Sequence, residues 1–232
     1  MAESALLKIT LSLIEARVLG CLIEKEMTTP DYYPLSLNAL TNACNQKSNR
    51  NPLMDIDETT VQNTLDVLIK KRLVVPKSSS GSRVSKFAHR LSNPITHAMD
   101  FSAQELAVLC ELLVRGPQTI GELRTHADRL TEFADVGQIE LVLQKLRSRE
   151  DGPFVTELPR QPGRRDVRHA QLFTELPLEA PAPITHDDML LRSESGTERI
   201  AALEQEVAAL RVEIAGVREQ LYQLANKEKG TV

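Results

Sequence analysis

The residues best suited to chemistry are cations that gather between positions 67 and 99. This stretch contains no Asp or Glu, although the whole chain is slightly acidic, with 28 basic and 32 acidic residues and a net charge of −4. Clustered Lys and Arg neutralise the phosphates of a nucleic-acid backbone. We therefore consider this stretch first for phosphate contact, and its cations are Lys70, Lys71, Arg72, Lys77, Arg83, Lys86 and Arg90.

Three further groups of polar residues suit the same chemistry. Lys47 and Arg50 belong to a polar loop, NQKSNRNP, whose Asn and Ser residues are equally typical of a turn that serves only as a scaffold. Asn and Gln read the edges of adenine, and the segment before the cations presents Thr59, Gln62 and Asn63. A second basic group, further along the chain, contains Arg160, Arg164, Arg165 and Arg168.

Two observations weigh against nucleic-acid binding. Asp55, Asp57 and Glu58 stand where a helix inserted in a groove meets phosphates, although acids at a helix start are also favoured by the helix dipole. The corresponding segment in the second half presents Glu140 and Gln144, which suit DNA less well. A basic stretch is also compatible with a plain solvated face, so both interpretations stay open.

The sequence contains no motif of an enzyme or of a cofactor site. It has no Gly-rich phosphate loop, no HExxH and no nucleophile elbow, and its five histidines are scattered. We therefore expect a non-enzymatic protein with neither a metal nor another cofactor. Cys21, Cys44 and Cys110 are far apart, which predicts reduced core thiols. Together with the lack of a signal peptide or an apolar run of membrane-spanning length, they indicate a cytoplasmic protein.

The basic residues are positioned by elements that the apolar spacing predicts. Helical periodicity indicates helices over 13–25, 36–44 and 59–71, the first with a capping box of Ser12 and Glu15. Strands are predicted at 73–75 and 84–91, with a basic, turn-rich tip at 77–83. This is the order of a winged-helix domain, whose third helix enters a major groove and whose hairpin, the wing, contacts the backbone or the minor groove.

The same order recurs in the second half of the chain. Helices are predicted at 102–115, from 119 onward and at 136–149, followed by a strand beginning at 154, a basic tip at 161–165 and a strand at 167–173. The apolar residues of 136–149 repeat the spacing of those in 59–71. We predict a mainly α protein with small β-hairpins (α+β), built from two tandem winged-helix domains over residues 1–98 and 99–174.

The C-terminal residues predict a linker and a coiled coil. Residues 175–193 are Pro-rich. Residues 194–228 are predicted to form a helix with an unbroken heptad pattern from Ile200 to Leu224. The g and e positions of a parallel pair have opposite charges, as in Glu206–Arg211 and Glu213–Arg218. This predicts a parallel homodimer, the alternative being a single helix that packs on its own chain. The predicted dimer interface consists of Ile200, Leu203, Val207, Leu210, Ile214, Val217, Leu221 and Leu224.

Several segments resemble a known family. They are YPLSLNALTNACNQKSNRNP (33–52), the helix end KKRLV (70–74), EARVLGCLIEKE (15–26) and AVLCELLVRGPQTIGELR (107–124). Together they are similar to the YceH-like family of bacterial proteins, over about residues 10–175 and a heptad tail. The resemblance implies a tandem winged-helix fold and a cytoplasmic bacterial protein, and it implies no reaction and no catalytic residues.

Two classes of function fit these observations. The first is a double-stranded DNA-binding protein, a transcriptional regulator that uses the third helix and the basic wing of its first domain. The alternative is a protein–protein interaction scaffold on the same fold, without direct DNA contact, which the acidic net charge favours. Affinity for DNA that falls steeply with salt distinguishes the first class from the second.

Overall fold

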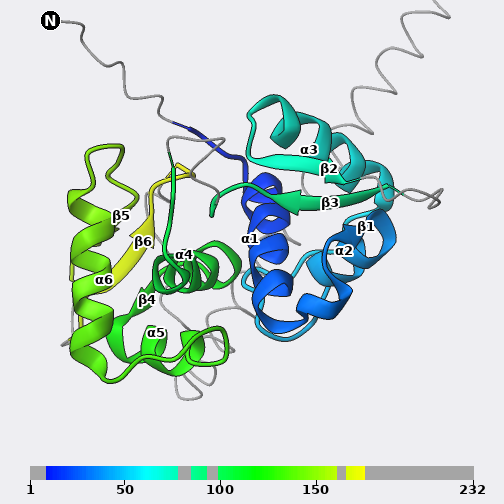
Figure 1. Cartoon of the computed structure of the whole chain (residues 1–232). Helices are drawn as coiled ribbons and strands as arrows, with labels where there is room; N and C mark the ends of the chain where they lie inside the picture. The colour runs from blue at the N-terminus through cyan, green and yellow to red at the C-terminus, as the bar shows by residue number, and fades with distance from the viewer. Residues whose placement is uncertain (1–8, 78–84, 93–98, 161–165, 176–232) are drawn as a thin grey trace, which may run out of the picture. The chain divides into compact units, whose positions relative to one another are not determined.

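The computed structural model describes residues 9–77, 85–92, 99–160 and 166–175, and the structural statements below concern these residues. They belong to one compact unit, which extends from Met1 to Ala180. Within them the chain is a mixed α+β protein with six α-helices and two small antiparallel sheets (Figure 1). None of the described helices is long and apolar enough to cross a membrane.

The first repeat, residues 9–92, contains three helices and one sheet. The helices are α1 (Leu13–Thr28), α2 (Leu37–Cys44) and α3 (Glu58–Lys70), and a short 3-10 turn, Pro30–Tyr32, follows α1. The strands are β1 (Leu35–Ser36), β2 (Val74–Lys77) and β3 (Lys86–His89). β3 lies between β1 and β2 and is antiparallel to both, with Leu35 opposite Phe87 and Val74 opposite His89.

The second repeat, residues 99–175, has the same order of elements. Its helices are α4 (Ala103–Arg115), α5 (Ile120–Ala127) and α6 (Val136–Ser148), and its strands are β4 (Gln118–Thr119), β5 (Val155–Glu157) and β6 (Arg168–Gln171). β6 lies between β4 and β5, as β3 does between β1 and β2. The two sheets therefore share one topology, which confirms the internal repeat that the helical spacing predicts.

The first helix of each repeat begins with a capping box. The Ser12 hydroxyl accepts from the backbone N–H of Glu15, whose carboxylate accepts from the N–H of Ser12, as predicted. Ser102 and Glu105 make the same pair of bonds. Each such cap stabilises its helix by about 1 kcal/mol. Glu15 also forms an ion pair with Lys71, at 2.9 Å, so the cap of α1 is tied to the end of α3.

The predicted helix bounds agree with the structure to within three residues. The strands predicted at 84–91, from 154 and at 167–173 contain β3, β5 and β6, whereas the strand predicted at 73–75 covers only the first half of β2, which continues to Lys77. The prediction missed β1 and β4. Each has only two residues and runs directly into a helix, so neither is long enough to show an alternating apolar pattern. Most residues of the two basic tips lie outside the described part of the chain, as do all residues of the predicted linker beyond Glu175 and of the heptad helix.

The hydrophobic core is continuous across the repeats because α1 packs against α4. At Gly20 the two helices approach too closely for a side chain, since an added Cβ would lie 2.8 Å from Val114 Cγ1 and 3.0 Å from Leu113 Cβ. The Sγ of Cys110 donates to the carbonyl oxygen of Gly20 at 3.4 Å. All three cysteines are buried and free, as the sequence predicts.

Gly20→Ala is expected to lower the free energy of unfolding by about 1 kcal/mol, because the overlap with Leu113 and Val114 outweighs the better helix propensity of Ala. The matched control is Gly121→Ala in α5, where an added Cβ meets nothing within 4 Å. There the substitution is expected to be neutral or stabilising by up to about 1 kcal/mol. Urea titration followed by circular dichroism measures both, and a stabilised Gly20→Ala variant contradicts the close approach.

The repeats are also joined where the chain enters and leaves each of them. The N–H of Leu11, before α1, donates to the carbonyl oxygen of Phe173, after β6, at 2.6 Å. The N–H of Phe101, before α4, donates to the carbonyl oxygen of Leu91, after β3, at 3.0 Å. The entry segment of each repeat is thus bonded to the exit segment of the other, and relative movement of the repeats breaks both contacts.

Candidate functional site

Several basic side chains at and after the end of the third helix of the first repeat form no ion pair with a described residue. Lys70 in the last turn of α3, Arg72 just after it and Lys77 at the end of β2 are exposed. Among the described residues, no carboxylate oxygen lies within 4.0 Å of any of the three. Lys86 and Arg90, at the two ends of β3, are partly exposed. The structure thus places a set of accessible positive charges along the end of α3 and the β2–β3 hairpin.

Two predicted residues have other partners. Lys71 Nζ contacts both carboxylate oxygens of Glu15 at 2.9 Å and donates to the carbonyl oxygen of Thr10 at 2.7 Å. The Nε2 of Gln62 donates to Asp66 Oδ1 at 2.9 Å. Lys71 therefore holds α3 to α1, and the amide of Gln62 is engaged on its own helix, so neither is counted with the accessible set.

The outer face of α3 keeps polar groups that suit a base edge. Thr59 and Asn63 are exposed, one turn apart. Two of the acids at the helix start, Asp57 and Glu58, have structural partners. The carboxylate of Asp57 caps α3 by accepting from the N–H of Thr60 at 2.7 Å, and hydrogen bonds from Thr60 lower the pKa of Asp57. Glu58 accepts from the side-chain amide of Asn38 at 2.8 Å. These contacts favour the capping explanation for the acids.

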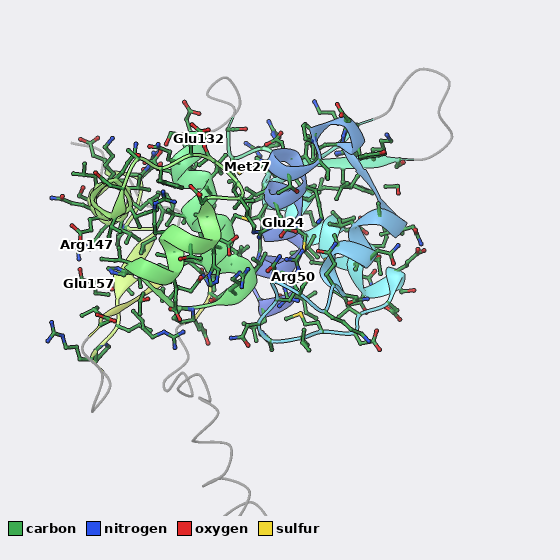
Figure 2. All side chains as sticks on the ribbon, turned by 90° about the horizontal axis from the view of Figure 1, so that it is seen from below. Glu24, Met27, Arg50, Glu132, Arg147 and Glu157 are labelled. Carbon is green, nitrogen blue, oxygen red and sulfur yellow. The ribbon has the colours of Figure 1, made fainter. Side chains whose placement is uncertain are left out.

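The structure corrects the prediction for Arg50. Its side chain has 0% exposure, and its guanidinium forms two bonds with the Glu24 carboxylate, Nη1–Oε1 at 3.1 Å and Nη2–Oε2 at 2.5 Å. Figure 2 shows both residues inside the molecule. The guanidinium also donates to the carbonyl oxygen of Ala43 at 3.0 and 3.1 Å. Such a buried side chain does not reach a phosphate. Arg50 instead holds the loop in place through its bonds to Glu24 and Ala43.

Lys47 differs from Arg50 although both lie in the same loop. Lys47 and Ser48 are exposed at the tip of residues 45–52. The loop is held at its base by Arg17, which donates to the carbonyl oxygens of Cys44 at 3.1 Å and Pro52 at 2.6 Å. Lys47 is therefore presented by a loop whose backbone is fixed from inside the protein.

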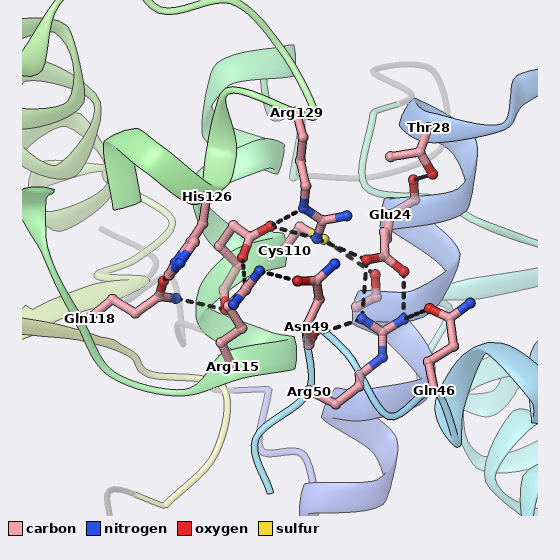
Figure 3. A network of polar contacts seen from close by, with 12 residues as sticks. Glu24, Thr28, Gln46, Asn49, Arg50, Cys110, Arg115, Gln118, His126 and Arg129 are labelled. Atoms are coloured by element: carbon pink, nitrogen blue, oxygen red, sulfur yellow. Dashed lines mark hydrogen bonds and ion pairs between the residues drawn. The ribbon is translucent and has the colours of Figure 1, made fainter. Parts of the chain in front are cut away.

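A buried charge network extends from Arg50 into the second repeat (Figure 3). Arg129, which follows α5, lies 2.8 Å from Glu24 Oε1 and 2.7 Å from Glu111 Oε1. Arg115 of α4 lies 2.7 Å from the other oxygen of Glu111 and donates to the side-chain oxygen of Asn49. Two buried carboxylates and three guanidiniums thus meet where the repeats join.

Burial and the neighbouring opposite charges shift the pKa values of Glu24, Arg50 and Arg129 in opposite directions. Burial alone raises the pKa of Glu24, but the hydrogen bonds and positive charge of Arg50, with further contributions from Lys25 and Arg129, lower it to about 2. The pKa values of Arg50 and Arg129 are raised by their carboxylate partners, against the effect of burial. Glu24, Arg50 and Arg129 are therefore ionised at neutral pH.

The basic group predicted in the second repeat is not brought together among the described residues. Arg160 is exposed, whereas the guanidinium of Arg168 is turned inward and donates to the carbonyl oxygen of Pro117. Arg164 and Arg165, like Arg83 of the first repeat, lie outside the described residues. The outer face of α6 presents Leu141, which is 59% exposed. At the equivalent position α3 presents Asn63, so the two helices offer different chemistry.

Sequence reasoning missed the buried network. The sequence did indicate buried acids, because Glu24 and Glu111 are charged residues within otherwise apolar helix faces. A buried acid requires a positive partner. Arg115 follows Glu111 by four residues on the same helix, a spacing that indicates an ion pair. The sequence alone did not identify Arg50 and Arg129, because they come from other segments of the chain.

Comparison with known proteins places the chain in a family. The family model described as "Protein of unknown function, DUF480" matches residues 11–164. The chain belongs to this family. It is 48% identical to a UPF0502 protein of Aeromonas hydrophila over 219 residues, covering 94% of this chain and 99% of the relative. A UPF0502 protein of Photobacterium profundum is 47% identical over 214 residues, covering 91% and 96%. These matches confirm the resemblance to the YceH-like family.

Proposed function

We propose that this member of the family is a non-enzymatic protein that binds double-stranded DNA and regulates transcription. Each repeat is a winged-helix domain in this proposal, with α3 of the first repeat in the major groove. The β2–β3 hairpin is the wing that contacts the phosphate backbone. The heptad helix over residues 194–228 forms a parallel homodimer, as its sequence predicts.

The order of elements supports the winged-helix assignment. Both repeats have a helix, a short strand, two helices and two strands, and in both the last strand lies in the middle of the sheet. This order places a third helix next to a hairpin, which is how winged helices present a groove-reading helix and a wing together. The contacts between α3 and β2 agree with that arrangement.

The observation that supports the proposal most directly is a group of exposed basic side chains that have no acidic partner among the described residues. Lys70, Arg72 and Lys77 are exposed and have no described carboxylate within 4.0 Å, while Thr59 and Asn63 occupy the outer face of the helix that leads to them. Phosphate-contacting cations beside a polar, base-reading helix face are what DNA recognition requires. By contrast, Lys71 beside them and Arg149 in the second repeat are engaged with acids.

The decisive experiment is fluorescence anisotropy of a labelled random duplex with the purified full-length protein. We expect affinity to fall steeply between about 50 and 200 mM salt, with a slope of about −0.9 for each phosphate contacted. A chain truncated after Glu175 is expected to bind more weakly, because it lacks the heptad helix that joins two DNA-binding units. Absence of binding at about 50 mM salt, a concentration that favours even non-specific contacts, refutes the proposal.

A second candidate function, a protein–protein interaction scaffold, is favoured by α6. Its outer face presents Leu141 and, near its start, Val136, which is 46% exposed, in place of the polar groups of α3. Exposed apolar side chains on a helix suit a protein partner better than a phosphate backbone. Pull-down of a salt-insensitive protein partner that is lost in a Leu141→Asp variant, without any DNA binding, favours this function.

A further inference from the structure

The loop that carries Lys47 is held from both repeats. From the first repeat, Arg50 binds Glu24 of α1. Asn45 Nδ2 donates to the carbonyl oxygen of Ile56 at 2.7 Å, and Asn45 Oδ1 accepts from the N–H of Ile56 at 2.9 Å. The side-chain oxygen of Gln46 accepts from Arg50 Nη2 at 3.1 Å. These contacts hold the residues before and after the exposed tip.

The second repeat contacts the other side of the same loop. The carbonyl oxygen of Val114, in α4, accepts from the N–H of Asn51 at 2.9 Å. Arg115, the last residue of α4, donates from Nη2 to the side-chain oxygen of Asn49. Figure 3 shows Asn49 lying between Arg115 and Arg50. Asn49 is thus the residue through which α4 reaches the tip that bears Lys47.

The anchor within the first repeat is shared as well. The Glu24 oxygen that accepts from Arg50 Nη1 also lies 2.8 Å from Arg129 of the second repeat. Arg129 in turn binds Glu111, which binds Arg115. The guanidiniums on both sides of the loop tip therefore belong to one chain of ion pairs that includes α4 and the segment after α5.

We propose that Arg115 and Asn49 are positioning residues, through which the second repeat sets the conformation of residues 46–50 and so presents Lys47 to a DNA phosphate. The inference rests on the proposed function and adds a role for the second repeat. That repeat raises DNA affinity through a loop of the first repeat, without contacting DNA at this point itself.

The backbone of Asn49 makes the inference testable with a mild substitution. Its φ is +58°, in the left-handed region, which Asn and Gly tolerate best. Asn49→Gly therefore keeps the backbone conformation available and removes only the side-chain contact with Arg115. Lys47→Ala removes the proposed phosphate contact and leaves the loop anchors in place. The two variants separate the positioning of the loop from the contact that the loop makes.

The experiment compares wild type, Asn49→Gly, Lys47→Ala and the double variant by anisotropy with the same labelled duplex. Loss of one phosphate contact lowers affinity about 4-fold at about 200 mM salt and reduces the salt slope by about one. We expect Lys47→Ala to show this full effect and Asn49→Gly to show a large part of it. In the Lys47→Ala background, Asn49→Gly is expected to have no further effect, because the contact it positions is already absent.

Three results overturn the inference. Asn49→Gly that binds DNA like wild type shows that α4 does not position the contact. If the effects of Asn49→Gly and Lys47→Ala on affinity are additive in the double variant, Asn49 acts on a different contact. If Lys47→Ala leaves the affinity unchanged, the loop makes no phosphate contact. In each of these cases wild-type binding stands, whereas absence of wild-type binding refutes the proposed function itself. Thermal melting of each variant shows whether a loss of affinity accompanies a loss of fold.

Discussion

Replacing Lys70, Arg72 and Lys77 together by Ala is expected to lower the affinity for a random duplex about 80-fold at about 200 mM salt. The estimate assumes one phosphate contact for each side chain, and each contact contributes about −0.9 to the slope of log K against log salt. Three lost contacts therefore reduce the slope by about 2.7. The effect is expected to grow as salt is lowered, because counterion release contributes more to binding there.

The measurement is an anisotropy titration at four or five salt concentrations, which gives the affinity and the slope together. A general fall in net charge also weakens DNA binding, so the control removes three cations from the second repeat, Arg124, Lys145 and Arg147. Its change in charge is identical, and two of its side chains already have partners in Asp128 and Glu157. We expect the control to bind close to wild type, and equal losses in both triple variants contradict a contact surface at the end of α3.

Local signals made most of the fold predictable. The capping box of Ser12 and Glu15, the N-cap Ser36 and the apolar stripes set helix starts and faces through contacts within a few residues. The repeat was visible because two sets of three helices have the same spacing. β1 and β4 were missed because a two-residue strand is defined by its partner, Phe87 for Leu35 and His169 for Gln118, and not by its own sequence.

The candidate site was less predictable than the fold, and Arg50 shows why. Lys47 and Arg50 belong to one polar loop and are three residues apart, yet one is exposed and the other has 0% side-chain exposure. What separates them is Glu24, a residue of another helix, inside the core. A local pattern contains no information on such a partner, so the sequence left phosphate contact and turn scaffold open for the whole loop.

Glu24→Gln is expected to lower the free energy of unfolding by about 3–5 kcal/mol. The Glu24 side chain is 1% exposed and compensates the buried Arg50 guanidinium while also contacting Arg129. The amide has nearly the same shape but no charge, and its NH2 group opposes a donor of Arg50. The variant thus leaves a positive charge buried without a full partner, which costs more than the loss of the pair itself. Urea unfolding at neutral pH measures the difference.

The matched control is Glu157→Gln. Glu157 forms an ion pair with Arg147, but the two side chains are 49% and 48% exposed, and they lie away from the junction of the repeats in Figure 2. An exposed pair of this kind contributes about 1 kcal/mol at most. Similar losses in Glu24→Gln and Glu157→Gln therefore contradict the role assigned to the buried network.

The pH dependence of Glu24→Gln distinguishes the lost charge from a packing defect. The pKa of Glu24 is about 2 in the folded protein, below its ordinary value of 4.5, so its carboxylate stabilises the fold fully above about pH 4.5. That contribution, about 3 kcal/mol for these two pKa values, is lost progressively as the pH falls toward 2. We expect the difference in unfolding free energy between wild type and Glu24→Gln to narrow over this range, because position 24 loses a charge only in the wild type and the other carboxylates titrate in both proteins. A gap that stays constant from pH 7 to pH 3 identifies a packing defect and rules out the buried ion pair as its cause.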